Sequence, residues 1–216
     1  MLSLVSILLR TRIASARSVA ALIALTASAS PLAAVEISVT PFAGYRWGGV
    51  LTDIPRRVDI DLRASASFGV AIDFEVAAGR RLELRYSRQP TDFKATGLNL
   101  DERLLPVRVD KLHLGGMKIW PGDEIRPFLV VSAGTTSFRP RSPQVKGDTR
   151  LSFGFGGGTQ LVLGSVAAIR LEARLFSILT SRGARAICLG DDCQLGYAGR
   201  NVMFQGELAA GLTLSF

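Results

Sequence analysis

The sequence has no hydrophobic run long enough to cross a membrane as a helix. The apolar stretch Val19–Leu25 is much shorter than the roughly 20 residues that a spanning helix needs. Elsewhere, apolar residues often alternate with small or polar ones. A chain without membrane helices can still span a bilayer as a closed β-barrel, because closing the sheet pairs its backbone groups. Bulk hydropathy therefore does not exclude a membrane protein.

Cysteine and histidine are also scarce, with only Cys188, Cys193 and His113 in the whole chain. These residues cannot complete a typical zinc site, so we predict no metal and no cofactor. In an exported chain, two cysteines this close in sequence favour a disulfide. The glycine and aspartates between them favour the turn that a Cys188–Cys193 bond requires.

Positive charge is in excess but is not clustered. The formal net charge is +8 at pH 7, and a basic chain can indicate nucleic-acid binding. The basic residues form no patch of the kind that nucleic acid needs, and the N-terminus carries an export signal. We therefore predict no nucleic-acid partner.

The N-terminal residues 1–34 have the three regions of a secretory signal. Arginines without any acidic residue precede the apolar stretch, and the small residues of Thr26–Ala34 follow it. Cleavage is expected after Ala29 or Ala34, which leaves residues 35–216 as a single mature domain. The alternative, an N-terminal membrane helix, would need a longer apolar run.

Alternation with period two predicts eight β-strands in the mature chain. Their expected ranges are Glu36–Arg46, Arg63–Val76, Arg80–Gln89, Arg108–Trp120, Ile125–Phe138, Arg150–Leu163, Val166–Leu179 and Arg200–Phe216. The connections between them alternate strictly in length. The long ones are Trp47–Leu62, Pro90–Val107, Arg139–Thr149 and Thr180–Gly199, and the short ones are Ala77–Gly79, Pro121–Glu124 and Gly164–Ser165. Tight periplasmic turns and longer outer loops are typical of bacterial outer-membrane barrels.

Each predicted strand has one apolar face and one small or polar face. In Arg150–Leu163, for example, Leu151 and Phe153 alternate with Ser152 and Gly154. The polar face suits a narrow lumen and the apolar face suits lipid. The alternative is a soluble lipocalin-like barrel, whose apolar face would turn inward. Aromatic residues at strand ends favour the membrane reading, as in interfacial girdles: Tyr45, Trp47, Tyr86, Trp120 and Phe216.

The closing strand carries the clearest family signal. Its apolar alternation continues to the last residue, and it resembles the final strand of bacterial outer-membrane β-barrels. The assembly machinery of that family reads a terminal aromatic, alternating hydrophobic residues and a glycine, matched here by Phe216, Leu214 and Gly211. The family places a polar residue where this chain has Ala209.

The whole of residues 35–216 resembles the outer-membrane protein A-like eight-stranded barrels. The resemblance rests on the architecture and on segments such as Pro41–Tyr45 and Leu112–Gly116. It implies an all-β, antiparallel, up-and-down transmembrane barrel in the bacterial outer membrane. It also implies contact with outer-membrane lipid, lipopolysaccharide and the β-barrel assembly machinery, with a monomer favoured. These motifs identify a fold and no activity.

Charged residues occur at inward positions in the middle of several strands. They are Asp73, Glu75, Glu83, Arg85, Arg170, Glu172, Arg174 and Glu207. One interpretation is a lining that selects ions. The other is a plug of mutual salt bridges, since eight strands leave an interior about wide enough for side chains alone. We expect the plug, because buried charges are tolerated only when they are paired.

Two features could suggest other chemistry. The glycine-rich segment Gly154–Gly158 would bind phosphate only before a helix, whereas Thr159–Leu163 continues as strand. His113 alternates with lipid-facing leucines and therefore points inward. Some outer-membrane barrels are lipid A deacylases or palmitoyltransferases, but no Asp or Ser is tied to His113 by spacing. We predict no catalytic residue.

Arginines occur at or next to the outer end of every predicted strand. By parity, Arg88, Arg108, Arg139 and Arg200 face outward, where their planar guanidinium groups could bind lipopolysaccharide phosphates. Arg46, Arg63 and Arg150 are expected to point inward and pair with acids. The alternative is that these charges only mark the water boundary.

The sequence therefore predicts a non-enzymatic outer-membrane barrel that supports the envelope and displays four surface loops for adhesion or ligand contact. The loops carry no motif that identifies a partner. A small-solute or ion pore is the first alternative, and an enzyme that modifies lipid A is the second.

Overall fold

The computed structural model describes residues 36–53, 58–97, 100–141, 147–179, 185–186, 195–196 and 202–216. The expected signal segment, both cysteines and Arg200 lie outside these residues. Signal cleavage and the Cys188–Cys193 disulfide therefore stay predictions. Within the described ranges, no helix is long and apolar enough to cross a membrane.

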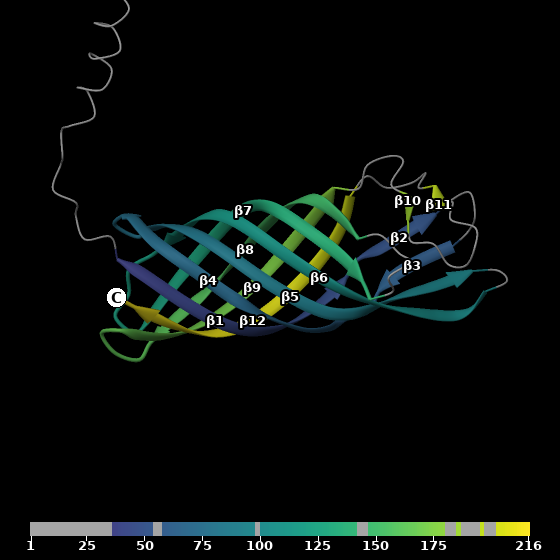
Figure 1. Cartoon of the computed structure of the whole chain (residues 1–216). Helices are drawn as coiled ribbons and strands as arrows, with labels where there is room; N and C mark the ends of the chain where they lie inside the picture. Colours follow the sequence, from purple (N-terminus) through teal and green to yellow (C-terminus); the bar gives the residue numbers. More distant parts are fainter. Residues whose placement is uncertain are drawn as a thin grey trace, which may run out of the picture. The chain divides into compact units, whose positions relative to one another are not determined.

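Eight antiparallel strands close into a barrel (Figure 1). They are β1 (Ile37–Gly48), β4 (Ser65–Ala77), β5 (Arg80–Gly97), β6 (Leu100–Ile119), β7 (Ile125–Pro140), β8 (Asp148–Val162), β9 (Ala167–Leu179) and β12 (Val202–Ser215). Each strand pairs with the next one along the chain, and β12 pairs with β1 to complete the ring. The predicted all-β, up-and-down barrel with eight strands is confirmed.

The two ends of the barrel chain are bonded to each other. The amide of Ile37 donates to the carbonyl of Phe216 at 3.3 Å, and the amide of Phe216 donates back at 2.9 Å. Further along the seam, the hydroxyls of Thr40 and Thr213 lie 2.9 Å apart. The pairing runs on to Gly48, opposite Gln205. Because the seam is continuous, the described barrel wall has no open edge.

The short connections lie together at one end, called here the turn end. The β4–β5 turn contains Gly79, whose φ of 64° is a left-handed value that favours glycine. A Cβ at this position would lie 2.6 Å from the carbonyl oxygen of Ile119. The turn therefore depends on glycine for both its conformation and its close contact with β6.

The opposite end, called the loop end, contains more strand than the sequence indicated. Strands β5 and β6 continue as a ribbon far beyond Gln89, and the first long connection forms a hairpin of β2 (Val50–Asp53) and β3 (Val58–Leu62). The prediction that Pro90–Val107 is a loop was wrong. It treated proline as a strand breaker, but Pro90 lies where β5 has left β4 and not yet met β3. A missing N–H is tolerated at such a position.

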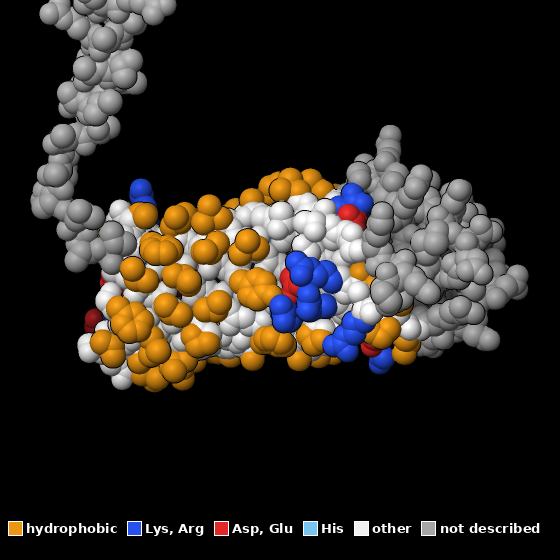
Figure 2. Space-filling view, viewed as in Figure 1, with side chains coloured by type: hydrophobic (Ala, Val, Ile, Leu, Met, Phe, Trp, Pro, Cys, Tyr) orange, Lys and Arg blue, Asp and Glu red, His pale blue; other side chains and the backbone are white. Residues whose placement is uncertain are grey.

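The outer surface of the barrel is a broad apolar belt (Figure 2). Side chains on the outward face are strongly exposed, for example Leu114 at 54% and Phe155 at 59%. Every strand of the ring contributes to this belt, which includes Phe68, Leu84, Leu112, Leu129, Leu151, Phe153, Leu175, Phe204, Leu208 and Leu212. An exposed apolar surface of this kind is typical of contact with lipid.

The barrel interior has both apolar and charged layers. A cluster near the turn end consists of Met117, Ile119, Phe128 and Val130. A second cluster near the loop end consists of Leu62, Phe93, Val107 and Val109. The sequence analysis described the lumen by its small and charged residues and did not separate these two clusters. The charged residues lie between them.

Candidate functional site

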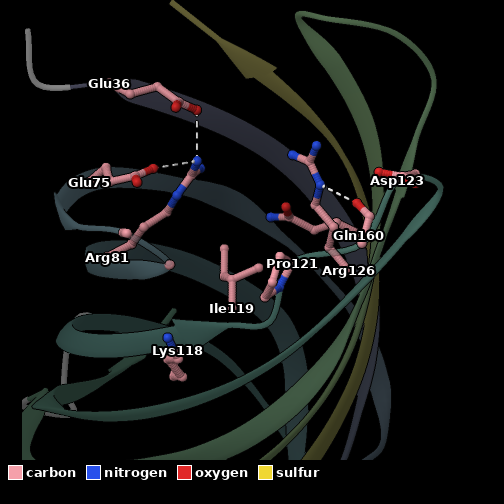
Figure 3. A pocket seen from close by; sticks show the side chains of 12 residues that line it. Glu36, Glu75, Arg81, Lys118, Ile119, Pro121, Asp123, Arg126 and Gln160 are labelled. Carbon is pink, nitrogen blue, oxygen red and sulfur yellow. Dashed lines mark hydrogen bonds and ion pairs between the residues drawn. The ribbon is translucent and has the colours of Figure 1, made fainter.

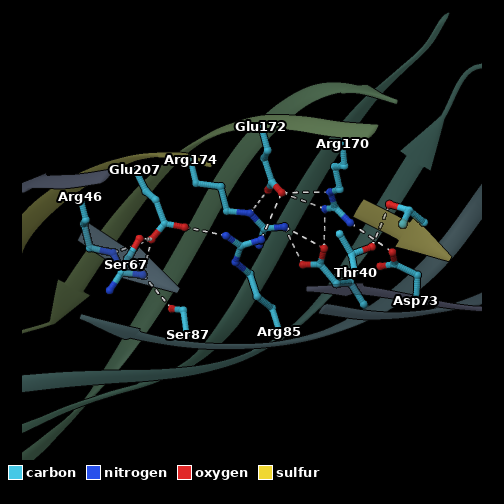
Figure 4. Close-up of polar contacts among 12 residues, drawn as sticks. Thr40, Arg46, Ser67, Asp73, Arg85, Ser87, Arg170, Glu172, Arg174 and Glu207 are labelled. Carbon is cyan, nitrogen blue, oxygen red and sulfur yellow. Dashed lines mark hydrogen bonds and ion pairs between the residues drawn. The ribbon is translucent and has the colours of Figure 1, made fainter. Parts of the chain in front are cut away.

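A continuous set of ion pairs crosses the middle of the lumen (Figure 4). Arg170 of β9 donates to Asp73 of β4 at 3.1 Å and to Glu83 of β5 at 2.6 Å. Arg174, one turn of the strand pleat further on, donates to Glu83 at 2.6 Å and also contacts Glu172. Because β9 lies opposite β4 and β5 in the ring, these contacts span the lumen.

The ion pairs continue toward the loop end. Arg85 donates to Glu172 at 3.2 Å and to Glu207 of β12 at 2.6 Å. The Nε of Arg46, on β1, donates to Glu207 at 2.6 Å, and its Nη2 donates to Ser87 at 2.7 Å. A single chain of hydrogen bonds therefore connects β1, β4, β5, β9 and β12.

We call these eight residues the lumen network: Arg46, Asp73, Glu83, Arg85, Arg170, Glu172, Arg174 and Glu207. All are buried, with at most 6% of the residue surface exposed. The formal charges of the four acids and four arginines cancel. Two guanidinium groups also stack on rings, with Arg85 3.7 Å above Phe42 and Arg170 4.6 Å above Phe128. Paired and stacked in this way, the charges can be buried without an uncompensated ion.

The network contains seven of the eight charges that the sequence placed in the lumen. The exception is Glu75, which lies near the turn end, where Arg81 joins it at 3.1 Å and joins Glu36 at 2.7 Å (Figure 3). These residues line an open pocket of about 510 Å³. Arg46 was predicted to point inward, but it was grouped with the strand ends. Only the register, which sets Arg46 opposite Glu207, brings it into the network.

Glycines of β8 make room for the network. A Cβ on Gly156 would lie 2.6 Å from Cγ of Arg174, and one on Gly158 would lie 2.9 Å from Cα of Glu172. The segment Gly154–Gly158 continues as strand in β8. Its small side chains serve lumen packing, and no helix follows that could bind phosphate.

His113 lies in the lumen beside the network and is bonded to two serines. Its Nδ1 lies 3.1 Å from Ser132 Oγ, and its Nε2 lies 2.9 Å from Ser152 Oγ. Spacing in the sequence could not connect these residues, because they come from β6, β7 and β8. None of the hydrogen bonds described for His113 involves a carboxylate, and the residue is only 1% exposed. The arrangement therefore lacks an acid partner and an open approach for a lipid.

Lys111 continues this chain of hydroxyl groups. Its ammonium donates to Thr136 at 3.2 Å, and Thr136 donates to Ser152 at 2.9 Å. The same ammonium lies 4.7 Å from the centre of the Phe176 ring. Lys111 is 2% exposed, and none of the ion pairs in the described part of the chain includes it. It is thus a buried cation held by a hydroxyl and a ring, without a carboxylate.

A second charged group lies on the outside of the barrel, and we call it the arginine cluster. It consists of Arg88, Arg108 and Arg139 around Asp110, with the hydroxyl of Tyr86. Arg88 and Arg108 reach the carboxylate through Nε at 2.9 and 3.0 Å. Arg139 approaches it at 3.7 Å. Basic side chains with one acid are visible at the border of the apolar surface in Figure 2.

The remaining rim arginines differ from this cluster. Arg150 meets Asp148 at 2.6 Å, and Arg63 lies 3.9 Å from Asp92. The prediction that Arg63 points into the lumen was wrong, since 56% of its side chain is exposed. Arg63 lies in the break between β3 and β4, where the regular alternation of strand faces is interrupted.

The sequence matches no protein-family model, and it matches no curated protein. Its barrel is similar to three solved structures. Neisserial surface protein A has a TM-score of 0.56 at 11% identity, over 84% of this chain and 97% of that one. OprG, an outer membrane protein from Pseudomonas aeruginosa, has a TM-score of 0.56 at 12% identity, over 85% and 96%. The outer membrane protein AlkL, solved in lipid bilayers, has a TM-score of 0.52 at 14% identity, over 84% and 90%.

The chain has the fold of the small outer-membrane β-barrels. At these identities the likeness concerns the fold and carries no activity. This outer-membrane barrel fold and the exposed apolar belt are those of a protein of the bacterial outer membrane. The turn end then corresponds to the periplasm and the loop end to the cell exterior.

Proposed function

We propose that the protein is a non-enzymatic, structural barrel of the outer membrane, with a lumen that does not conduct ions and with loops displayed outside. The observation that carries this proposal is the lumen network. Its charges are bonded to one another from wall to wall, between two apolar clusters. An ion crossing the barrel would have to separate these pairs and then pass the apolar layers.

Energetics support a closed lumen. An interior made by eight strands is about wide enough for side chains alone. Removing one partner of a buried ion pair typically costs about 3–5 kcal/mol, because the other charge is left uncompensated. Opening the network for a passing ion would meet a cost of the same kind at several pairs. The network is therefore better suited to hold the walls together than to line a path.

A pore is the second candidate, and one observation favours it. Several buried polar atoms on the loop-end side of the network have no hydrogen-bond partner, namely both amide atoms of Gln205, Oε1 of Gln89 and Nη1 of Arg46. Such groups are commonly satisfied by water. A water-filled outer half alone would not conduct, because the network still separates it from the turn-end pocket.

An enzymatic role has weaker support. His113 is the only histidine, and it is enclosed in the lumen with hydroxyl partners. Modification of lipid A would need a reactive group that reaches the outward face. In the described part of the chain, the outward polar side chains at the belt border are the arginine cluster and Tyr86, which supply charge and no nucleophile–base pair.

Single-channel recording in planar bilayers tests the proposal. The purified wild-type protein should show no steady conductance. The double variant Glu172→Ala, Arg174→Ala removes a facing acid and base, leaves the net charge unchanged and should open a measurable current. The matched control Asp123→Ala, Arg126→Ala changes the same residue types at the exposed turn end and should stay silent. Steady ion-selective current through the wild-type barrel would contradict the proposal in favour of the pore.

We also propose that the closing strand is the contact for the β-barrel assembly machinery. Phe216 is 79% exposed at the turn end, and Leu214 is exposed on the same face. A Cβ on Gly211 would lie 2.7 Å from the carbonyl of Pro41, so the glycine permits close seam packing. The terminal side chains are therefore available for recognition before and after the barrel closes.

A further inference from the structure

We propose that the arginine cluster is a binding site for the phosphate groups of lipopolysaccharide in the outer leaflet. This inference goes beyond the structural role proposed above and does not depend on a closed lumen. It commits to a lipid-borne phosphate as the ligand. Four observations support it: the excess charge, the facing arginines, the position at the belt border and the contrast with other rim arginines.

The cluster has more positive charge than its own acid can neutralise. Three guanidinium groups share the single carboxylate of Asp110, which leaves a formal excess of two positive charges. Arg88 and Arg108 use Nε for this contact, and Arg88 donates a further bond to Tyr86 at 2.8 Å. The terminal nitrogens of Arg108 and Arg139 make no hydrogen bond described in the structure. These are the donors that bind phosphate in a bidentate manner.

Two of the arginines face each other directly. Arg108 of β6 and Arg139 of β7 are cross-strand partners on the outward face. Like charges directly opposite each other destabilise a strand pair. Asp110 offsets this repulsion only in part, because it approaches Arg139 at 3.7 Å while it bonds to Arg108 at 3.0 Å. A second anion between the two guanidinium groups would complete the pairing.

The position of the cluster points to a lipid. Asp110 and Arg108 occupy the same face of β6 as Leu112 and Leu114, which are 51% and 54% exposed in the apolar belt. The strand therefore passes from hydrocarbon-facing residues directly to charged ones, moving toward the loop end. A phosphate attached to a lipid headgroup would meet the arginines while its acyl chains pack on the leucines. Arg is well suited to such a site because its planar group matches phosphate geometry.

Other rim arginines in the described chain are not arranged in this way. Arg150 has its own aspartate at 2.6 Å, and Arg46 is fully buried in the lumen network. The predicted collar of four outward arginines is thus replaced by a one-sided site on β5, β6 and β7. Arg200, the fourth member of that prediction, lies outside the described residues. The asymmetry predicts one ordered lipid on this side of the barrel rather than a ring of lipids.

The first experiment measures lipopolysaccharide that co-purifies with the protein from outer membranes. The test variant combines Arg88→Gln, Arg108→Gln and Arg139→Gln. The control combines Arg63→Gln, Arg80→Gln and Arg126→Gln, three exposed arginines elsewhere that change the net charge equally. We expect the test variant to lose bound lipid by about tenfold or more, since losing charge-assisted hydrogen bonds changes an equilibrium by at least that factor. The control should keep the wild-type level, and equal retention in both variants would overturn the proposal.

The second experiment identifies the phosphate and checks folding. Wild-type barrels in nanodiscs should bind diphosphorylated lipid A more tightly than its dephosphorylated form, and the test variant should lose this preference. No preference in the wild type would overturn the proposal. Inorganic phosphate at millimolar concentration should not displace the lipid, and full displacement would point to a free anion as the ligand instead. The gel shift between heated and unheated samples reports barrel folding in each variant, independently of bound lipid.

Discussion

Arg174 of β9 and Glu83 of β5 are bonded to each other across the lumen. Nη2 of Arg174 donates to both carboxylate oxygens of Glu83, at 2.6 and 2.9 Å. The two strands are not neighbours in the ring, so this pair joins opposite walls of the barrel. Arg170 donates to the same carboxylate at 2.6 Å. Glu83 is therefore the acid on which two arginines of one strand converge.

The change Glu83→Gln should strongly destabilise the barrel. It keeps the shape of the side chain but leaves Arg170 and Arg174 with less negative charge in a buried site. Breaking a buried ion pair costs about 3–5 kcal/mol, and we expect a loss in this range in the free energy of unfolding. Urea unfolding in detergent micelles, followed by tryptophan fluorescence, measures it. Glu75→Gln is the control, because the Glu75–Arg81 pair is partly exposed and should change stability by less than about 1 kcal/mol.

The change Lys111→Met should leave stability unchanged or raise it. Lys111 is buried with a hydroxyl partner and a ring but without a carboxylate, so its charge is costly to bury. Met has a similar length and keeps the contact with Phe176 through its sulfur. The same unfolding measurement applies. A loss of more than about 2 kcal/mol would show that the ammonium has a stabilising role which its contacts do not reveal.

Much of the fold could be predicted from the sequence because a membrane barrel obeys a strict period. In β8, for example, Phe153 and Phe155 alternate with Ser152 and Gly154, so each residue has only one face available. The same parity placed Asp73 and Arg170 inward. It could not show which charges meet, because partners such as Asp73 and Arg170 come from strands far apart in the chain. Pairing across a lumen depends on barrel stagger, which sequence spacing does not contain.

The outer features were harder to predict for related reasons. Parity placed Arg88, Arg108 and Arg139 outward, but only register shows that all three reach Asp110. The serines of His113 were missed because β7 and β8 supply them. The extension of β5 was missed because Pro90 is normally a breaking signal. Each omission concerns contacts between strands, while the features predicted correctly are those of single strands.

A disulfide between Cys188 and Cys193 remains a prediction from the sequence. Unreduced protein should contain no thiol that reacts with maleimide, whereas protein reduced after denaturation should contain two. The loop that it closes is short, so removal of the bond should cost at most about 2 kcal/mol. Its expected role is to restrict the last outer loop, and Cys188→Ser, Cys193→Ser should be cleaved faster by external protease. Labelling of both cysteines in the unreduced native protein would contradict this prediction.

Deletion of Phe216 should slow assembly into the outer membrane. The residue is the terminal aromatic of the closing strand, and its amide and carbonyl bond to Ile37 across the seam. Pulse-chase fractionation should show less folded barrel in the membrane and more unfolded protein in the periplasm. Phe216→Tyr keeps an aromatic end and the backbone bonds, so it should assemble at the wild-type rate. Normal assembly of the deletion variant would remove the basis for the assembly signal.

Two alanine substitutions should separate lumen packing from the general effect of removing a glycine. A Cβ on Gly156 would lie 2.5 Å from the carbonyl oxygen of Ala173 and 2.6 Å from Cγ of Arg174. A Cβ on Gly116 would meet no atom within 4 Å. Both glycines lie inside strands, Gly156 facing the lumen and Gly116 facing outward, so the backbone entropy that alanine removes is similar.

We expect Gly156→Ala to destabilise the barrel by about 1–3 kcal/mol, the usual cost of overpacking a filled interior. Gly116→Ala should be neutral or stabilise it by up to about 1 kcal/mol, because alanine restricts the unfolded chain. Comparing urea unfolding of the two variants in micelles gives the difference directly. Because Arg174 is fixed by Glu83 and Glu172, it cannot move aside without breaking an ion pair. Equal stability of the two variants would mean that the network yields to an added methyl group, and a network that yields so easily would also be a weak barrier to ions.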